Sequence, residues 1–430
     1  MPLTSFRPEL LAPAGNLAKL RVALRYGANA VYLGGPTLSL RSGTGGFDRD
    51  AVAHGVELAH AAGVQVYYCL NAFPLETDLT AVRETLVMLD ALPPGQRVDG
   101  VIIADPGVFA LARKFLPNTP VHVSTQANTG NSAAVAFWQE LGATRVNLAR
   151  ELTLRDLRQI RRAVPDMELE LFVHGAMCLA LSGRCSLSAH LNARSANKGS
   201  CTQPCRFNYR PHAQAMVLEE QLRPGDILWE VLEGEDFTAF FSPRDVCLVK
   251  YLPWLCRNRI NALKIEGRMR SAAYVALACD VYRTALDDFG RGCFQPSQYL
   301  HELGMALHRP MDSGFFLPGA PAATAKRWDC LGTKTMVGHL QRQEVPGQWL
   351  TQVLDRWNAG EPVEVVLPGL RRPVLRPGEY GLENERGDSL ELAHPGQRVM
   401  LRCDHPECYE DIFIRQTQSV ATGRNRGTTR

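Results

Sequence analysis

The stretch ELLAPAGNLAKLRVALRYGANAVYLGG (9–35) decides the fold, because it contains one complete strand–helix–strand unit. Two short apolar runs, 9–13 and 30–34, flank a segment, 17–26, whose leucines recur at helical spacing. Gly27 is expected to end that helix in the left-handed conformation. Uninterrupted apolar runs suit parallel strands that are covered on both faces. The stretch therefore predicts an α/β protein with a parallel sheet.

The same unit recurs along the first 290 residues. Six further apolar runs bring the number of candidate strands to eight: 64–70, 100–105, 120–124, 144–149, 169–175 and 262–267. Helical patterns fill most intervals, and Thr153 with Asp156 forms a capping box at the start of one of them. Eight strands with intervening helices predict a TIM-like (β/α)8 barrel. A doubly wound open sheet is the alternative, although no G-x-G-x-x-G motif follows the first strand.

One interval is much longer than a connection requires. The seventh and eighth strands are separated by an insertion, 175–260, that contains most of the clustered cysteines. A β-hairpin or small sheet is expected at 212–241, with a turn at 224–226. A helix is expected to begin at Ser242, which would place Cys247 in its first turns, where the helix dipole favours a thiolate.

Composition changes along the chain predict its domains. The expected organisation is a barrel domain with the insertion (1–308), a linker rich in Pro, Gly and Ala (309–330), a small β-barrel or sandwich (331–415) and a polar, disordered tail (416–430).

The overall composition of the 430 residues excludes several classes of protein. With 45% hydrophobic and 21% charged residues the chain is globular, and its formal charge of +3 does not by itself indicate nucleic-acid binding. No amino-terminal apolar run resembles a signal peptide, and no apolar run is long enough to span a bilayer. We therefore expect a cytoplasmic protein without membrane contact, whose 12 cysteines form no disulfides. Cys69, Cys279 and Cys293 stand apart and are expected to be packing thiols.

Four cysteines in the insertion indicate a metal centre: Cys178, Cys185, Cys201 and Cys205. A structural zinc site usually shows C-x2-C pairs, and none occurs here. A radical S-adenosylmethionine enzyme requires C-x3-C-x2-C, whose third position is occupied by Asn208.

An iron–sulfur cluster tolerates longer and irregular spacing between its four thiolates. Cys178, Cys185 and Cys201 are the expected ligands, and the fourth is Cys247 or Cys205. Cys247 is favoured for its predicted position at a helix start.

Long motifs in the insertion resemble a known family. Residues 170–188 (ELFVHGAMCLALSGRCSLS) match the defining motif of the collagenase-like peptidase family, family U-32. The stretches SPRDVCLV (242–249) and LKIEGRMRSAAYV (263–275) are similar to further blocks of that family. The resemblance covers about residues 8–290, and 331–415 resembles the carboxy-terminal β domain of some members.

The resemblance implies several activities. It is strongest to proteins of tRNA hydroxylation, which convert the wobble uridine to 5-hydroxyuridine without oxygen, with prephenate as the expected hydroxyl donor. A 4Fe-4S cluster on the motif cysteines is implied. Other members hydroxylate ribosomal RNA or ubiquinone precursors, and some are described as collagenases.

The sequence alone speaks against a standard peptidase, since it contains neither H-E-x-x-H nor G-x-S-x-G. A nucleophilic cysteine near His174 is conceivable, but a nucleophile would not require three further clustered thiols. A non-catalytic RNA-binding module is a further alternative. The oligomeric state is not determined by the sequence.

Charged and polar residues at strand ends are the other candidates for the site. Lys264 and Arg268 are expected to bind a small anionic substrate, and Glu266 and His174 are candidate catalytic groups for proton transfer. An ion pair between Lys264 and Glu266 that closes the barrel is an equally good interpretation, and a structural role for His174 is a slightly better one. 

The polar residues Ser124 and Gln126 follow the fifth strand, where they are candidates for substrate binding or simple helix capping. A tRNA surface is only weakly indicated, by Arg155, Arg158 and Arg162 on one helix, because such stripes usually face solvent.

Overall fold

The computed structural model describes residues 6–40, 46–178, 180–192, 194–206, 245–306, 311–317 and 332–417, with the backbone of four short strands between 218 and 239. The chain divides into two compact units. The first comprises Met1–Leu300 and Arg309–Asp329, and the second comprises His301–His308 and Cys330–Arg430.

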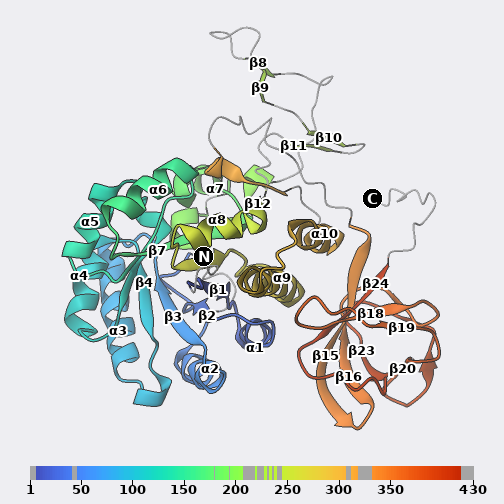
Figure 1. The fold of residues 1–430 in the computed structure, drawn as a ribbon. Helices are drawn as coiled ribbons and strands as arrows, with labels where there is room; N and C mark the ends of the chain where they lie inside the picture. The colour runs from blue at the N-terminus through green and yellow to red at the C-terminus, as the bar shows by residue number, and fades with distance from the viewer. Residues whose placement is uncertain are drawn as a thin grey trace. The chain divides into compact units, whose positions relative to one another are not determined.

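The first unit is a closed barrel of eight parallel strands (Figure 1). These are β1 Glu9–Pro13, β2 Ala30–Leu33, β3 Gln65–Leu70, β4 Gly100–Ile103, β5 Val121–Val123, β6 Arg145–Asn147, β7 Glu168–Ala176 and β13 Ala262–Ile265. Strands β1 to β7 pair in chain order, and β13 pairs with both β1 and β7, which closes the ring. The predicted (β/α)8 barrel and all eight predicted strands are confirmed.

Helices alternate with the strands around the barrel. They are α1 Leu17–Arg25, α2 Arg49–Ala61, α3 Leu79–Asp90, α4 Pro106–Phe115, α5 Ser132–Glu140, α6 Leu154–Ala163, α8 Leu252–Arg257 and α9 Ala272–Arg291. A further helix, α10 Pro296–Ala306, follows α9 and contains residues of both units. Local sequence signals account for their ends. The capping box of Thr153 and Asp156 is present at the start of α6, and Gly27 follows α1 with a φ of 88°.

The insertion after β7 contains α7 Leu187–Asn192 and two two-stranded sheets, β8 Leu218–Glu219 with β9 Ile227–Trp229 and β10 Leu232–Gly234 with β11 Phe237–Ala239. The predicted turn at 224–226 lies outside the described residues.

The helix predicted to begin at Ser242 is wrong, although Ser242 itself lies outside the described residues. Asp245–Cys247 forms the strand β12, which runs antiparallel to the end of β7. The reason is that β7 extends past its barrel neighbours, so its backbone groups require a partner there. A further strand, β14 Met311–Asp312, pairs with β12, and helix α8 begins only at Leu252.

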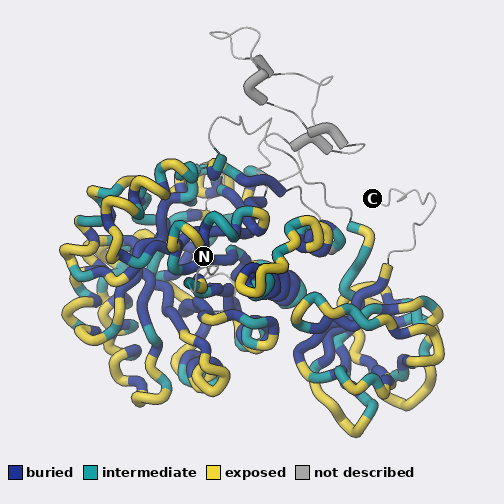
Figure 2. Tube along the Cα trace, in the orientation of Figure 1, coloured by how far each residue is buried: buried dark blue, intermediate teal, exposed yellow. Residues whose placement is uncertain are grey.

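Burial is concentrated in the barrel strands and on the inner sides of the helices, as Figure 2 shows. Inside the barrel an apolar cluster contains Leu11, Ala30, Tyr32, Tyr67, Cys69 and Ile102. Among the described residues, none of the helices is both long and apolar enough to cross a bilayer.

The second unit contains an eight-stranded curled antiparallel sheet of order β19-β18-β24-β15-β16-β23-β20-β21. Its strands are β15 Lys334–Val345, β16 Gln348–Val353, β18 Val363–Val366, β19 Val374–Leu375, β20 Gly381–Glu383, β21 Ser389–Leu390, β23 Arg398–Arg402 and β24 Phe413–Thr417, with β17 Trp357–Asn358 paired to β22 Leu392–Ala393. Trp357 is fully buried and belongs to the apolar core of this unit. Strand β24 includes the first two residues of the predicted tail.

Candidate active site

A cavity of about 300 Å³ lies at the carboxyl ends of the barrel strands. Its wall takes residues from the segments that follow β3, β5, β6, β7 and β13, such as Asn71, Gln126, Arg150, Cys178 and Glu266. Active sites of (β/α)8 enzymes form at this end of the barrel, because the loops after the strands converge there. The cavity is therefore the candidate active site.

Four thiols of the insertion line this cavity, namely Cys178, Cys185, Cys201 and Cys205, and the thiol of Cys69 in β3 lines it as well. The four thiols of the insertion are partly exposed. Cys247 does not line the cavity: it is fully buried in β12, opposite His174 of β7. Cys178, Cys185 and Cys201, which belong to both predicted ligand sets, thus share one cavity with Cys205. Cys247, the other candidate for the fourth ligand, lies in a different environment.

The segment that carries the thiols is bound to the loop after β6 through Ser182. Glu151 accepts hydrogen bonds from the backbone N–H of Ser182 (2.6 Å) and from its hydroxyl (2.7 Å). Ser182 and Gly183 both have positive φ, 44° and 86°. A Cβ at Gly183 would approach the Nε2 atom of Gln126 to 2.9 Å and the Cys178 sulfur to 3.5 Å, so only glycine fits this turn without displacement.

A second group of contacts binds the same segment to the loops after β3 and β5. The Arg184 guanidinium donates to the carbonyl of Gln126 (2.7 Å), and the backbone N–H of Phe73 donates to the carbonyl of Asn197 (2.8 Å). The Asn197 side chain accepts from the N–H of Cys185 (3.1 Å). These contacts hold the thiols against the mouth of the barrel.

Two of the sulfur atoms accept backbone hydrogen bonds. The N–H of Leu187 donates to Cys185 Sγ (3.4 Å), and the N–H of Gln203 donates to Cys201 Sγ (3.3 Å). Such N–H···S bonds stabilise negative charge on sulfur and tune the potential of iron–sulfur clusters. The donor set therefore suits a thiolate-bound group. Within the described ranges, however, no three His, Cys, Asp or Glu side chains stand close enough to share one ion.

The floor of the cavity carries a buried ion pair. Lys264 Nζ lies 2.7 Å from Glu170 Oε1, and both side chains are almost completely excluded from solvent. Lys264 lines the cavity and also lies over the ring of Tyr32, 4.4 Å from its centroid. The predicted pairing of Lys264 with Glu266 is therefore wrong. The barrel closes by pairing β13 with β7, and this brings Glu170 of β7 within reach of Lys264.

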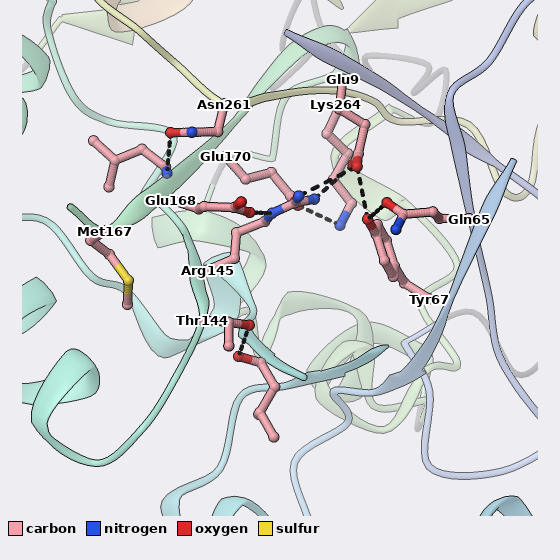
Figure 3. Close-up of polar contacts among 12 residues, drawn as sticks. Glu9, Gln65, Tyr67, Thr144, Arg145, Met167, Glu168, Glu170, Asn261 and Lys264 are labelled. Carbon is pink, nitrogen blue, oxygen red and sulfur yellow. Dashed lines mark hydrogen bonds and ion pairs between the residues drawn. The ribbon is translucent and has the colours of Figure 1, made fainter. Parts of the chain in front are cut away.

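Below this pair, the barrel interior contains a chain of charged groups (Figure 3). Arg145 lies 2.7 Å from Glu9, 2.8 Å from Glu168 and 3.7 Å from Glu170. Tyr67 donates to Glu9 (2.7 Å). Burial raises the pKa of Tyr67 above its usual range, and the nearby Glu9 carboxylate acts in the same direction. This network fixes the position of Glu170 and so of Lys264.

A second buried cation reaches the cavity from the loop after β13. Arg268 is 3% exposed and donates to the Ser39 hydroxyl (2.8 Å). Burial raises the pKa of the nearby Cys69 thiol, and the positive charge of Arg268 opposes the rise. Lys264 and Arg268 thus both line the cavity, as predicted for residues that bind an anion.

Glu266 lines the cavity and faces a third cation, Arg150. The Arg150 guanidinium lies 3.8 Å from the Glu266 carboxylate, donates to the carbonyl of Ala176 (2.9 Å) and lies 3.9 Å from the ring centroid of Phe172. Glu266 is therefore an acceptor at the cavity wall, beside a fixed positive charge.

His174 is placed behind the cavity wall. Its imidazole is fully buried, does not line the cavity, and stacks on Tyr274 with 5.8 Å between ring centroids. Among the residues that the structure describes, neither ring nitrogen has a hydrogen-bond partner. Burial lowers the pKa of His174 to about 3, and the nearby Arg270 contributes. This environment holds the ring neutral and suits a packing role.

Ser124 and Gln126 both line the cavity. Ser124 caps the short helix Thr125–Ala127, since its hydroxyl accepts from the N–H of Gln126 (3.4 Å), and the Asn71 amide donates to the same hydroxyl (3.3 Å). Ser124 therefore caps the helix, as one interpretation predicted, and also lines the cavity.

Sequence reasoning missed Arg150 and Asn71 as cavity residues, although both follow predicted strands and a search of all polar residues at strand ends would have included them. It also took Cys69 for a packing thiol: Cys69 is buried, but it lines the cavity. Cys279 is buried as expected, whereas Cys293 is exposed.

Comparisons with known proteins give consistent results. The model of "Peptidase family U32" matches residues 15–326. The chain is 36% identical over 417 residues to tRNA hydroxylation protein P1 of Bacillus subtilis (strain 168), covering 93% of this chain and 92% of that protein. It is 37% identical over 343 residues to tRNA hydroxylation protein P of Escherichia coli (strain K12), with coverage of 72% and 74%. A collagenase of Porphyromonas gingivalis (strain ATCC BAA-308 / W83) is 28% identical over 323 residues, with coverage of 72% and 73%.

Proposed function

This chain belongs to peptidase family U32, and on that premise we propose that it is an enzyme that hydroxylates tRNA. The resemblance found in residues 170–188 is thereby confirmed. The observation that carries the proposal is the extent of the similarity to tRNA hydroxylation protein P1, which spans both compact units of this chain.

The finer part of the proposal concerns the reaction. We propose conversion of the wobble uridine to 5-hydroxyuridine, with prephenate as the source of the hydroxyl group. A cavity of about 300 Å³ lies at the lower end of the range for small-molecule sites and has room for a small carboxylate. Lys264, Arg268 and Arg150 would bind its negative charges, because buried cations at a cavity wall favour an anionic ligand.

Glu266 has the geometry to position the substrate. Its carboxylate lines the cavity next to Arg150, so it can accept a hydrogen bond from a base or from a hydroxyl group. Ser124 and Gln126 offer polar groups on the loop after β5. His174 is assigned no role in the chemistry, because it does not line the cavity.

A 4Fe-4S cluster is proposed on Cys178, Cys185 and Cys201, where it would supply electron-transfer chemistry. The shared cavity and the N–H···S bonds support this assignment. The fourth ligand is one of two thiols. Cys205 lines the cavity and requires no movement of β12, whereas Cys247 would require one.

Peptidase activity of the cysteine–histidine kind has no support in the cavity. Among the described residues that line it, none is a histidine, so no thiol there has an imidazole beside it as a general base.

Iron analysis tests the cluster. Protein purified without oxygen is expected to be brown, with about four irons per chain. Alanine variants of Cys178, Cys185 or Cys201 should lose the iron, and the Cys256→Ala variant, in which a buried thiol outside the cavity is removed, should keep it. Iron retention in Cys205→Ala against Cys247→Ala identifies the fourth ligand. Stoichiometric zinc without labile sulfide would eliminate the cluster.

Nucleoside mass spectrometry tests the reaction. Bulk tRNA from cells in which the gene has been deleted should lack 5-hydroxyuridine derivatives, and the wild-type gene should restore them. Lys264→Met or Arg268→Gln genes should restore less. Unchanged nucleosides in the deletion strain, with no second pathway present, would refute the proposed function.

A further inference from the structure

A second cavity of about 300 Å³ lies on the outside of the barrel and is lined almost entirely by arginines. Helix α6 supplies Arg158, Arg161 and Arg162, and the end of α8 supplies Arg257, Asn258 and Arg259. We call this site the arginine hollow. Its two halves are about a hundred residues apart in the sequence and meet only because the barrel brings α6 and α8 together.

One of these arginines has a structural role. Arg161 donates to the carbonyl of Met167 (2.8 Å) and to the side chain of Asn261 (2.7 Å). The other four side chains are exposed. Arg158 lies near the ring of Trp254 (5.8 Å) and Arg257 near that of Phe289 (5.9 Å).

Four guanidinium groups of the hollow have no carboxylate partner among the described residues. In the part of the chain that the structure describes, Arg158, Arg162, Arg257 and Arg259 form no ion pair with Asp or Glu. Like charges gathered in one place repel one another. The pKa of Arg161 is lowered, mainly by burial and also by the positive charge of Arg259, while the carboxylates of Asp166 and Glu168 act in the opposite direction. An anion bound between the arginines would remove this repulsion.

Helix dipoles do not account for the arrangement. A cation in the last turn of a helix is favourable, which explains Arg161 and Arg162 in α6 and Arg257 in α8. Arg259 lies beyond α8 with a φ of 52°. Residues other than glycine adopt this left-handed backbone conformation at a cost in free energy. Its presence in the hollow is therefore unexplained by helix stability.

The hollow is distant from the catalytic cavity. Arg161 contacts Met167 and Asn261, which directly precede β7 and β13, so the hollow lies near the amino ends of the strands. The cavity lies at their carboxyl ends. Phe172 and Ala176 of β7 line the cavity, 5 and 9 residues beyond Met167, which corresponds to about 17 to 30 Å at ~3.3 Å per residue. A ligand that occupies both sites must extend over such a distance, as a folded RNA does and a small anion does not.

We propose that the arginine hollow binds backbone phosphates of the RNA substrate, away from the base that reacts. Guanidinium groups bind phosphate through paired N–H donors, and phosphate contacts position a nucleic acid without reading its sequence. The inference rests on the proposed function, because the proposed tRNA substrate identifies the phosphate-bearing ligand as RNA.

The test compares two charge-matched double variants of the full chain. Arg162→Gln with Arg257→Gln alters the hollow, and Arg83→Gln with Arg113→Gln removes the same charge from exposed arginines of α3 and α4 outside either cavity. Binding of bulk tRNA is measured by fluorescence anisotropy between 50 and 200 mM salt. The plot of log affinity against log salt should become shallower by about 1.5 in the hollow variant, since each lost phosphate contact removes ~0.7–0.9.

The result that overturns the inference is equal tRNA binding by the two variants. Thermal melting in the presence of inorganic phosphate tests whether the hollow binds a free anion instead of RNA. The inference is also overturned if phosphate stabilises the wild type but not the hollow variant while both proteins bind tRNA equally well. Failure of the proposed function looks different. Unaltered tRNA nucleosides in the deletion strain together with weakened RNA binding by the hollow variant would leave the hollow as an RNA site.

Discussion

Replacing Lys264 by Met tests whether the buried ion pair under the cavity holds the barrel together. Methionine keeps an unbranched apolar side chain over the ring of Tyr32, so the substitution mainly removes the charge. It leaves Glu170, which is 1% exposed, without its partner at 2.7 Å. The remaining cation, Arg145, is 3.7 Å from Glu170 and already faces Glu9 and Glu168.

The magnitude follows from this charge count. In the wild type, three carboxylates share Lys264 and Arg145, and in the variant they share one guanidinium. Leaving a buried charge unpaired costs about 3–5 kcal/mol. Glu170→Gln leaves the buried Lys264 ammonium without its carboxylate partner and should cost a similar amount. The double variant Lys264→Met with Glu170→Gln should therefore be more stable than Lys264→Met alone.

Urea unfolding of the full chain measures the effect. Because two compact units need not unfold together, the transition is followed by pulse proteolysis with detection of peptides from β4 to β7. With a slope of ~3 kcal/mol/M, the midpoint should fall by about 1 M or more.

The matched control is Lys198→Met, which breaks an exposed pair with Asp78 (3.0 Å) and should cost at most ~1 kcal/mol. Equal stability of the Lys264→Met and Lys198→Met proteins would show that the interior network is solvated and that the reasoning is wrong.

Two further predictions concern the end of β7. Burial lowers the pKa of His174 from 6.5 to about 3, so its contribution to stability is complete above pH 6.5 and is lost as the pH falls towards 3. Between pH 7 and pH 5 the His174→Phe protein should lose ~2 kcal/mol less stability than the wild type in urea titrations, and parallel losses would contradict the assignment. A Cβ at Gly175 (φ 105°) would lie 2.6 Å from the carbonyl oxygen of Glu266, so Gly175→Ala should reduce the yield of soluble protein or lower its melting temperature severely. Gly63→Ala, with φ 69° and no atom within 4 Å, should cost only ~1–2 kcal/mol, and similar melting temperatures for the two would count against the steric argument.

Local signals in the sequence determined the fold class. Strand lengths, helical spacing, the capping box of Thr153 and the glycine at 27 depend on neighbours a few residues away, so they could be recognised without the structure. The thiols at 178 and 185 were singled out for the same reason, because the family motif at 170–188 is contiguous. The helix expected at Ser242 failed, because the end of β7 offered Asp245–Cys247 a strand partner.

Contacts between distant segments were decided only by the tertiary structure. Lys264 pairs with Glu170 and not with Glu266, because β13 closes the barrel against β7 in a register that no local pattern encodes. The same closure places His174 behind the wall. It also joins Arg158 and Arg259, a hundred residues apart, in one hollow. Sequence periodicity fixes which residues form an element, whereas the partner of a side chain depends on how the elements pack.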